Sequence, residues 1–344
     1  MTFQDDYGVI EDARAKLGKR LAILAHHYMS DAVVRHADHT GDSLELSRKI
    51  ADLDAQCVIF CGVRFMAETA AILTKPGQKV FIPEFDSRCV MSDMAPARLV
   101  RDVLNRLAEA GLGVTPLAYV NSSVAVKALV GAHGGSVCTS ANAGAMLAWA
   151  MAQGPRVLFL PDACLGLNTA DRIGLPEEER HMLDVREHGA AICHEKAAGA
   201  RLLLWPGQCA VHSRFKPETI RKAREASPGC LTAVHPECRP ATVALADSCG
   251  STSHIIRFAA DAPEGSVLYV GTEYNLVNRL AQEHAGAKTI RALGHSTCSN
   301  MEKITESSLA GLLANLDNTP AVAVSETLNA PARLAVQRML EVCA

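Results

Sequence analysis

The sequence has few aromatic residues, no basic excess and no long uninterrupted apolar run. Aromatic residues make up 4 % of its 344 residues, and the formal net charge is −3. Nucleic-acid-binding proteins usually show a basic excess or stripe, and a membrane span needs roughly 18 or more mostly apolar residues in a row. We therefore expect no nucleic acid and no membrane among the partners of this chain.

The first twenty residues do not predict a secretory leader. The first residues, MTFQDDYGVIEDARAKLGKR, are charged and contain no apolar segment of the kind found in signal peptides, so we expect a cytoplasmic protein. Thiols stay reduced in that compartment, and the twelve cysteines are therefore not expected to form a disulfide framework. Most of them, such as Cys57, Cys61, Cys138 and Cys230 in apolar strand-like runs, are expected to be small buried residues.

Short β-branched runs alternate with longer helical patterns, which is typical of parallel α/β sheets. Hydrophobic residues make up 49 % of the chain, enough for a large core. The alternation repeats three times, which indicates three similar βαβ-based domains. The predicted strands cover 21–28, 56–63 and 79–84 in the first unit, 114–121, 136–140 and 156–162 in the second, and 230–237, 247–251 and 266–273 in the third.

Polar residues follow the first strand of each unit, in the sequences HHY (26–28), YVN (119–121) and HPE (235–237). In two units a second strand ends in a turn of small residues, CTSAN (138–142) and CGSTS (249–253). Ligands of open parallel sheets bind beyond the carboxyl ends of the strands. The pattern therefore predicts that three such ends face one central site.

Residues 163–200 break the pattern, and we interpret them as an insertion or a lid-like excursion. They carry His181, His188, His194 and Cys193. The end of the chain predicts a strand at 320–326 and a helix after it, which pack back on the first unit. The predicted domains are 1–86 plus about 305–344, then 87–205 with an insertion near 163–200, and then 206–304.

Cysteine spacing alone selects no metal site, because the chain has no CxxC and no ferredoxin-like run. Cys57 and Cys61 form CxxxC without a third partner. Cys89, Cys209 and Cys298 share a different setting, since each follows a strand and a loop that contains Gly or Ser. Thiolates in such positions can converge on one metal centre.

A series of short motifs, spread over almost the whole chain, resembles quinolinate synthase in the order of that family. Each motif alone is unspecific, whereas the ordered series is specific. The motifs are HHY at 26–28, GDS at 41–43, FMAETA at 65–70, YVNSS at 119–123, CTSANA at 138–143, FLPD at 159–162, WPGQCAVH at 205–212, HPEC at 235–238, GSTS at 250–253 and CSNM at 298–301. The cysteine spacing resembles the longer bacterial form of the family.

The resemblance implies an enzyme of NAD biosynthesis that condenses iminoaspartate with dihydroxyacetone phosphate to quinolinate, with loss of phosphate and two waters. The implied fold is three similar three-layer α/β/α domains with parallel sheets about a pseudo-threefold axis, in agreement with the repeats. The implied cofactor is a 4Fe-4S cluster, bound by Cys89, Cys209 and Cys298, whose open iron serves as a Lewis acid. Hand-over of iminoaspartate from an aspartate-oxidising or aspartate-dehydrogenating enzyme stays an open question.

The resemblance also implies roles for ten further residues. Catalytic roles in acid–base chemistry fall to Tyr28, His235 and Glu237, with Glu237 the preferred base, and to His212 beside the cluster. Substrate-binding roles fall to His26, Ser43, Tyr119, Asn121, Ser140 and Thr252, three of which would bind anionic groups at helix N-termini. Taken without the resemblance, Ser43 and Ser140 are more simply read as helix N-caps.

The sequence departs from the family pattern at three places. Ser87 and Arg88 precede Cys89 where Ala-Gly is expected, and Arg64 stands where His is common. Ala163 and Cys164 replace polar residues after FLPD. A cation beside Cys89 would favour a thiolate but could crowd its loop.

Two other classes of function are open. A zinc-dependent aldolase or hydrolase could take its ligands from the histidines of 163–200 and from HPEC, although no tight Cys/His pairing is present. A non-enzymatic iron–sulfur sensor would need a DNA-binding or partner-binding segment, and neither a helix-turn-helix signal nor a basic stripe is found.

Overall fold

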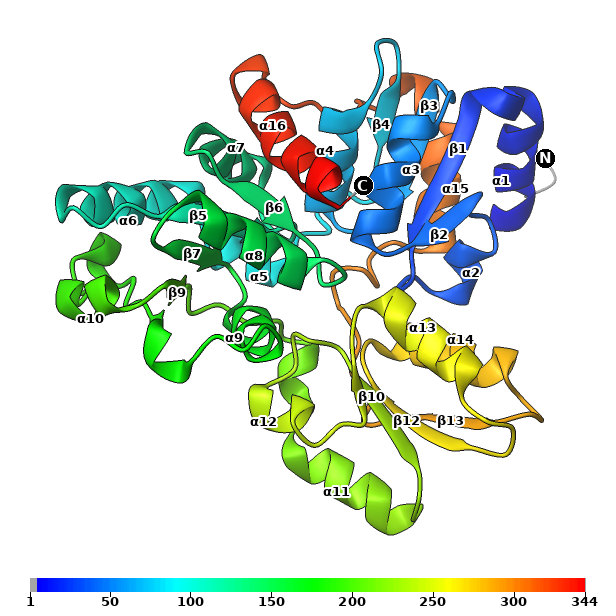
Figure 1. The fold of residues 1–344 in the computed structure, drawn as a ribbon. Helices are drawn as coiled ribbons and strands as arrows, with labels where there is room; N and C mark the ends of the chain where they lie inside the picture. The colour runs from blue at the N-terminus through cyan, green and yellow to red at the C-terminus, as the bar shows by residue number, and fades with distance from the viewer. Residues whose placement is uncertain (1–4, 344) are drawn as a thin grey trace.

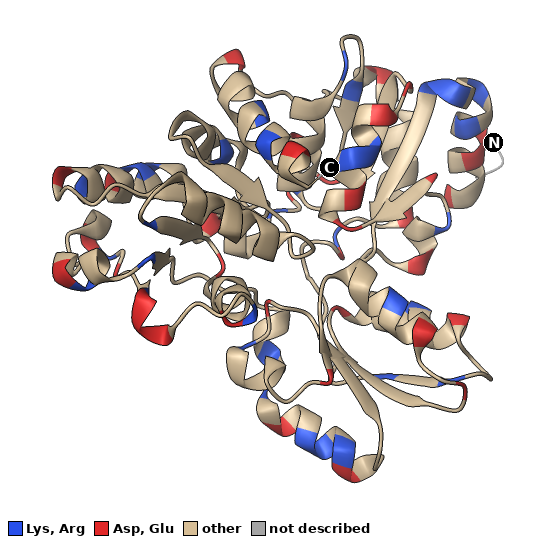
Figure 2. Ribbon diagram, in the orientation of Figure 1, with Lys and Arg blue, Asp and Glu red and all other residues tan. Residues whose placement is uncertain are grey.

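The computed structural model of the chain describes residues 5–343. Three separate sheets, each flanked by helices, surround the middle of the molecule (Figure 1). Every paired strand in them is parallel to its neighbour. The predicted fold class, α/β with three α/β/α domains and parallel sheets, is thereby confirmed. Both signs of charge are scattered over the outer helices (Figure 2).

The first sheet has the strand order β2-β1-β3-β4. Its central strand β1 reads LAILAH and is buried at every residue, as expected for a parallel strand covered on both faces. The elements of this unit are α1 (Asp6–Leu17), η1 (Gly18–Arg20), β1 (Leu21–His26), α2 (Asp31–Val34), β2 (His39–Gly41), α3 (Ser43–Asp52), β3 (Cys57–Cys61), α4 (Arg64–Leu73) and β4 (Lys79–Phe81).

The second sheet has the order β6-β5-β7-β9-β8 and is therefore one strand wider. The elements of this unit are α5 (Val90–Asp93), α6 (Ala97–Glu109), β5 (Thr115–Tyr119), α7 (Val124–Ala132), β6 (Ser136–Cys138), α8 (Ala143–Gln153), β7 (Val157–Leu160), α9 (Ala163–Arg172), η2 (Glu177–Glu179), β8 (Arg180–Met182), η3 (Glu187–Gly189), α10 (His194–Gly199) and β9 (Leu202–Leu204).

The third sheet has the order β11-β10-β12-β13. Its elements are η4 (His212–Arg214), α11 (Pro217–Ala226), β10 (Leu231–Val234), α12 (Pro240–Val243), β11 (Ser248–Cys249), α13 (Thr252–Asp261), β12 (Val267–Gly271), α14 (Tyr274–Glu283) and β13 (Thr289–Ala292). In all three sheets the first strand of the unit lies between the second and the third, so the units share one topology.

Residues 163–200 form part of the second unit, which contains the five-stranded sheet. Strand β8 pairs in parallel with β9 and extends the edge of the sheet. Helix α9 packs on α8 and α12, and its Asn168 donates hydrogen bonds of 2.7 Å to the carbonyl oxygens of Pro236 and Cys238. The segment therefore supports the HPEC loop as well as widening the sheet.

The chain ends in α15 (Glu306–Ala314), η5 (Leu316–Asn318) and α16 (Glu326–Val342). Helix α15 packs on α1 of the first unit. The C-terminal helix α16, which we expected on the first unit, contacts α4 there but packs mainly on α7 of the second unit. The predicted strand at 320–326 is wrong, because the residues of this range that precede α16 form a loop. One backbone hydrogen bond joins the loop to β4, from the Val322 N–H to the Val80 carbonyl over 2.8 Å. The predicted domain boundaries stay a prediction.

No helix among residues 5–343 is both long and apolar enough to cross a membrane.

Replacing Gly131 by alanine is expected to destabilise the fold by about 1–3 kcal/mol, measured by thermal unfolding. A Cβ at Gly131 in α7 would lie 1.9 Å from the Pro331 carbonyl oxygen of α16. Gly311→Ala in α15 is the matched control, because nothing lies within 4 Å of its Cβ position, and it should stabilise by up to about 1 kcal/mol. Equal melting temperatures for the two variants would contradict the close approach of α7 and α16.

Candidate functional site

The carboxyl ends of the three sheets face one cavity of about 600 Å³, its open mouth included. Residues from all three units line it, together with an apolar wall that includes Phe65, Met66 and Met301. Every site residue predicted from the sequence is part of this lining: His26, Tyr28, Ser43, Cys89, Tyr119, Asn121, Ser140, Cys209, His212, His235, Glu237, Thr252 and Cys298.

The same turn follows the central strand of the first and third sheets. The Tyr28 amide donates to His26 Nδ1 over 3.2 Å, and the Glu237 amide donates to His235 Nδ1 over 3.4 Å. In each turn the next backbone amide also returns to the histidine carbonyl, at 2.9 Å. Because Nδ1 accepts in both rings, the neutral imidazole carries its proton on Nε2.

Burial keeps both of these imidazoles neutral. It lowers the pKa of His26 to about 3, with a further contribution from His27, and it lowers the pKa of His235 to about 3, with a further contribution from His212. The two side chains are thus neutral hydrogen-bond donors at physiological pH. A neutral N–H donor can hold a carboxylate or phosphate oxygen without carrying charge into the cavity.

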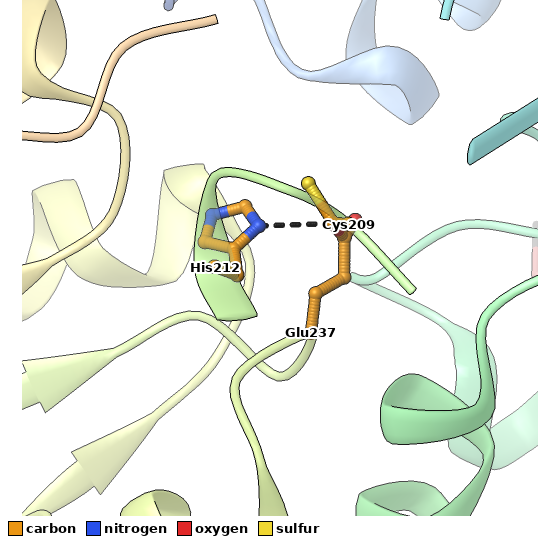
Figure 3. Close-up of side chains that lie close together, drawn as sticks. All are labelled: Cys209, His212 and Glu237. Carbon is orange, nitrogen blue, oxygen red and sulfur yellow. Dashed lines mark hydrogen bonds and ion pairs between the residues drawn. The ribbon is translucent and has the colours of Figure 1, made fainter. Parts of the chain in front are cut away.

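The Glu237 carboxylate receives hydrogen bonds from two units. Tyr119 Oη donates to Oε1 over 2.5 Å, and His212 Nδ1 donates to Oε2 over 2.9 Å. Figure 3 shows His212 on η4 and Glu237 on the loop after β10, with Cys209 beside them. His235 stacks on the His212 ring, with centroids 4.3 Å apart and planes at 17°. The network therefore fixes the Glu237 carboxylate at the cavity wall.

Glu237 is held in its ionised form. Burial would raise its pKa, but the neighbouring His212 and His235 rings and the hydrogen bonds from His212 and Tyr119 outweigh burial, so the pKa lies below its usual range. Burial and the Glu237 charge raise the pKa of Tyr28 and of Tyr119 well above 10. The site thus combines one carboxylate base with two phenol donors.

Asn121 presents an unpaired oxygen in the cavity. Its Oδ1 is buried and has no hydrogen-bond partner among the described residues, so a ligand is needed to satisfy it. The loop around Asn121 is clamped by Lys127, a fully buried residue of α7 whose Nζ donates to the carbonyls of Val120, over 2.8 Å, and Ser122. Burial lowers the pKa of Lys127 to about 7.

Three hydroxyl-bearing residues lie at helix N-termini on the cavity wall, but they are not the caps of those helices. Asp42 caps α3 in place of Ser43, in a capping box with Glu45, and Ser251 caps α13 in place of Thr252. The interpretation of Ser43 as an N-cap is therefore wrong. The same interpretation of Ser140 is also wrong, because Asn142 occupies the N-cap position of α8.

The hydroxyl of Thr252 has no hydrogen-bond partner among residues 5–343, although it is buried. It lies on the cavity wall at the first residue of α13. Helix N-termini carry unpaired N–H groups and favour anions. This end of the cavity therefore has the chemistry of a carboxylate or phosphate pocket.

Cys89, Cys209 and Cys298 each begin the same kind of turn, in three different units. The backbone amide four residues after each cysteine donates to the cysteine carbonyl, at 3.0 to 3.2 Å. Burial raises the pKa of all three thiols, to about 12 for Cys89, while backbone amides three residues further along, at Ser92, His212 and Met301, lower it. Convergent thiols with amides directed at the sulfur suit a metal–thiolate centre.

Asp162 is a buried residue that the sequence analysis did not single out, although it stands in FLPD. Its Oδ1 accepts from the Leu165 amide over 2.7 Å and caps α9, and its Oδ2 accepts from the Cys209 amide over 3.2 Å. One side chain thus ties the start of α9 to the Cys209 loop. An acid directly after a strand and before a helix was the signal available in the sequence.

Of the two departures next to Cys89, Arg88 faces outward and Ser87 is buried. Arg88 pairs with Asp93 at 3.1 Å and its side chain is 59 % exposed, so it does not crowd the loop. Arg64 pairs with Glu68 at 2.9 Å, and its guanidinium lies over the Phe85 ring, 4.2 Å from the centroid. Ser87 is buried, and its hydroxyl donates to the Gly62 carbonyl.

The histidines of 163–200 are not among the residues that line the cavity. His188, for example, is exposed and bonds Asp102. Within the described part of the chain, the group with metal-ligand spacing is Cys209, His212 and Glu237, whose donor atoms lie within 4.8 Å of one another (Figure 3). The zinc site expected from the 163–200 histidines is thus not assembled.

The sequence matches known proteins over almost its whole length. The family model described as quinolinate synthetase A protein matches residues 9–341. The chain belongs to the quinolinate synthase family. It is 43 % identical to the quinolinate synthase of Acidobacterium capsulatum over 97 % of this chain and 92 % of that one. It is 42 % identical to the enzyme of Streptomyces coelicolor over 95 % and 86 %, and 43 % identical to that of Herpetosiphon aurantiacus over 97 % and 91 %.

Membership in the quinolinate synthase family makes this chain an enzyme of NAD biosynthesis. The resemblance found in the ordered motifs is thereby confirmed. The cavity at the meeting point of the three sheets contains every residue that the resemblance implied for the site.

Lys127→Met is expected to destabilise the protein by about 2–5 kcal/mol, because it leaves two buried carbonyls without their donor. Chemical denaturation measures the change. Lys222→Met, at an exposed position of α11, is the control and should change stability by less than about 0.5 kcal/mol. Wild-type stability of Lys127→Met would show that the clamp on the Asn121 loop contributes nothing.

Proposed function

We propose that the chain is a condensing and dehydrating transferase that forms quinolinate from iminoaspartate and dihydroxyacetone phosphate, with loss of phosphate and two waters, in the cytoplasm. The observation that carries this proposal is the cavity shared by three units. It combines three thiols, the ionised carboxylate of Glu237, three imidazoles and two phenols. Hand-over of iminoaspartate from an aspartate-oxidising or aspartate-dehydrogenating enzyme is compatible with this site.

A 4Fe-4S cluster fits the donor set of this cavity. Cys89, Cys209 and Cys298 would hold it, one from each unit, because each thiol lines the cavity and is approached by a backbone amide. With three protein ligands, one iron is left open and supplies a Lewis acid when the cluster is bound.

Binding of the substrates falls to groups that donate hydrogen bonds. Both substrates carry anionic groups, and the hydroxyls of Ser43, Ser140 and Thr252 lie at or next to helix N-termini that favour anions. The protonated Nε2 of His26 adds a neutral donor. Tyr119 and Asn121 orient the substrate, and the unpaired Oδ1 of Asn121 calls for an N–H or O–H group of the ligand.

Proton transfer falls to residues on both sides of the cavity. Tyr28 acts as a general acid–base group near the sugar-derived hydroxyls and carbonyl. Glu237 is the base for the tautomerisation and dehydrations, and each of its oxygens keeps a lone pair beyond the bonds from Tyr119 and His212. His235 assists as a neutral donor, and His212 orients the carboxylate.

The metal content of anaerobically purified protein tests the cofactor assignment. We expect about four irons and four sulfides per chain, together with quinolinate formation from supplied substrates. Cys89→Ser, Cys209→Ser and Cys298→Ser should each lose the cluster and the activity. Cys230→Ser, at a buried position away from the cavity lining, is the control and should keep both.

Two outcomes would contradict the cofactor assignment. Zinc without sulfide in the active protein would favour a mononuclear site at Cys209, His212 and Glu237. A full iron complement in the protein that lacks all three cysteines would show that the ligands lie elsewhere.

Glu237→Gln is expected to lower kcat by about 10²–10⁴-fold, because the amide keeps the shape of the side chain but loses the base. Steady-state quinolinate formation measures the loss, with iron content checked on the same sample. Glu218→Gln, on the outer face of α11, should leave kcat unchanged. Full activity in Glu237→Gln would exclude Glu237 as the base.

A further inference from the structure

The loops that carry Cys89, Cys209 and Cys298 are anchored in the same way. In each case the first amide of the helix after β3, β7 or β12 donates to the carbonyl of the residue two positions before the cysteine. These bonds run from Arg64 to Ser87, from Ala163 to Gly207 and from Tyr274 to Ser296, over 2.7, 2.9 and 2.9 Å. The three loops therefore occupy equivalent places, and their support can be compared residue by residue.

The residue at the N-cap of these three helices differs. It is Asp162 before α9 and Glu273 before α14, both of them buried acids, but it is Val63 before α4. Carboxylates at an N-cap accept from backbone amides, whereas the Val63 side chain offers no acceptor. Two of the cysteine loops thus lie beside an acid, and the loop of Cys89 does not.

Asp162 binds the Cys209 loop while it caps its own helix. Its Oδ1 accepts from the Leu165 amide over 2.7 Å, and its Oδ2 accepts from the Cys209 amide over 3.2 Å. Hydrogen bonds to a charged acceptor are stronger than those between neutral groups. The backbone at Cys209 is therefore fixed at the residue that carries the thiol.

Glu273 has the corresponding place beside Cys298. Its Oε2 accepts from the Asn275 amide over 2.8 Å and from the Leu276 amide, while its buried Oε1 has no hydrogen-bond partner among residues 5–343. Burial raises the pKa of Glu273 to about 7, and the amides of Asn275, Leu276 and Cys298 lower it. A buried oxygen without a partner is costly, so Oε1 is available to the Cys298 amide.

A buried hydroxyl also ties these two loops to each other. Ser296 lies two residues before Cys298, and its Oγ donates to the carbonyl of Val211, two residues after Cys209, over 2.8 Å. Movement of one loop would break this bond as well as its own tie to an acid. Cys209 and Cys298 thus form a pre-organised pair.

The loop of Cys89 is held by neutral groups and at residues ahead of the cysteine. The Ser87 hydroxyl donates to the Gly62 carbonyl over 3.2 Å. The exposed Lys303 ammonium donates to the Asp86 carbonyl over 2.9 Å. Neither side-chain bond reaches the backbone of Cys89 itself, so this loop can open at lower cost than the other two.

Cys89 also borders a second cavity, of about 520 Å³ with its open mouth included. Arg64, Glu68 and Arg88 are among the residues that line it, and the Arg88 side chain is 59 % exposed. Cys209 and Cys298 are not part of this lining. Water and small ions can therefore approach Cys89 from outside the substrate cavity.

We propose that Cys89 is the cluster ligand that binds last during assembly and opens first during cluster loss. The acids at the two other cap positions are positioning residues, which keep Cys209 and Cys298 in place. When Cys89 opens, its sulfur keeps the electron pair of the bond that breaks and takes a proton from water, so no oxidant or reductant is needed. The inference rests on the proposed cofactor, because it assigns an order to the ligands of that cluster.

Thiol labelling during cluster loss tests this order. Anaerobically purified protein, with its iron and sulfide counted, is treated with an iron chelator and iodoacetamide, and the cysteine peptides are quantified by mass spectrometry. Cys89 should be alkylated about 10-fold faster than Cys209 and Cys298, because its loop lacks one hydrogen bond to a charged group. Equal rates, or faster labelling of either other cysteine, would overturn the inference.

Two variants test the positioning acids. Asp162→Asn and Glu273→Gln keep an oxygen for the helix cap and lose the acceptor for the cysteine amide. The first should raise the labelling rate of Cys209 about 10-fold and the second that of Cys298, each without changing the other. Asp5→Asn, the same change at the cap of α1, is the control and should leave every rate unchanged. An equal rise at all three cysteines would reduce the acids to a structural role and overturn their assignment.

The metal count separates failure of this inference from failure of the proposed cofactor. A wild type without iron and sulfide would refute the cofactor and, with it, any order of ligands. Equal labelling rates in protein that contains four irons and four sulfides would refute the order alone. If circular dichroism shows that a variant does not fold, the labelling order in the wild type still decides.

Discussion

The structure depends on the convergence of three parallel sheets at their carboxyl ends. Parallel strands direct all of their carboxyl ends to one edge, so each unit can present several side chains there but cannot enclose a site alone. Placing three such edges around one point produces one shared cavity with an equivalent cysteine turn in each wall. The three cysteine turns are the plainest sign of this repetition. In each, the backbone amide four residues after the cysteine donates a hydrogen bond to the cysteine carbonyl.

The Glu237 carboxylate shows how the units are made to depend on one another. A buried charge is costly unless it is fully paired, and the two bonds to this one come from Tyr119 of the second unit and His212 of the third. Tyr28 of the first unit reaches the same network through a hydroxyl of the third. Separation of the units would therefore leave buried polar groups unpaired, which favours the assembled arrangement.

The strands that end at the cavity could be predicted from the sequence, because buried runs such as LAILAH and polar residues directly after them are local signals. The predicted strand at 320–326 failed although its apolar pattern is typical of a strand, because a strand also needs a partner edge, and only one backbone bond to β4 forms. Strand β8 was missed because its sequence, RHM, has no such pattern.

The site residues implied by the ordered motifs all reached the cavity, whereas the residues that support them from behind did not stand out. Asp162 looks like an ordinary helix cap, but its second oxygen accepts from the Cys209 amide of the third unit. Thr272 directly follows the buried strand β12, and its hydroxyl contacts Tyr28 of the first unit. These partners lie many residues away, so no local pattern marks them. The capping interpretation of Ser43 failed for a local reason, because Asp42 directly before it is the better placed acceptor.

The most direct test of the central claim, that one cavity shared by three units holds a cluster with an iron open to ligand, is a Mössbauer spectrum. The protein is loaded with ⁵⁷Fe and recorded with and without quinolinate. The account predicts the signal of a 4Fe-4S cluster in which one iron out of four changes its parameters when quinolinate is added. A spectrum that quinolinate leaves unchanged in all four irons, or one without a 4Fe-4S signal in an active protein, would contradict it.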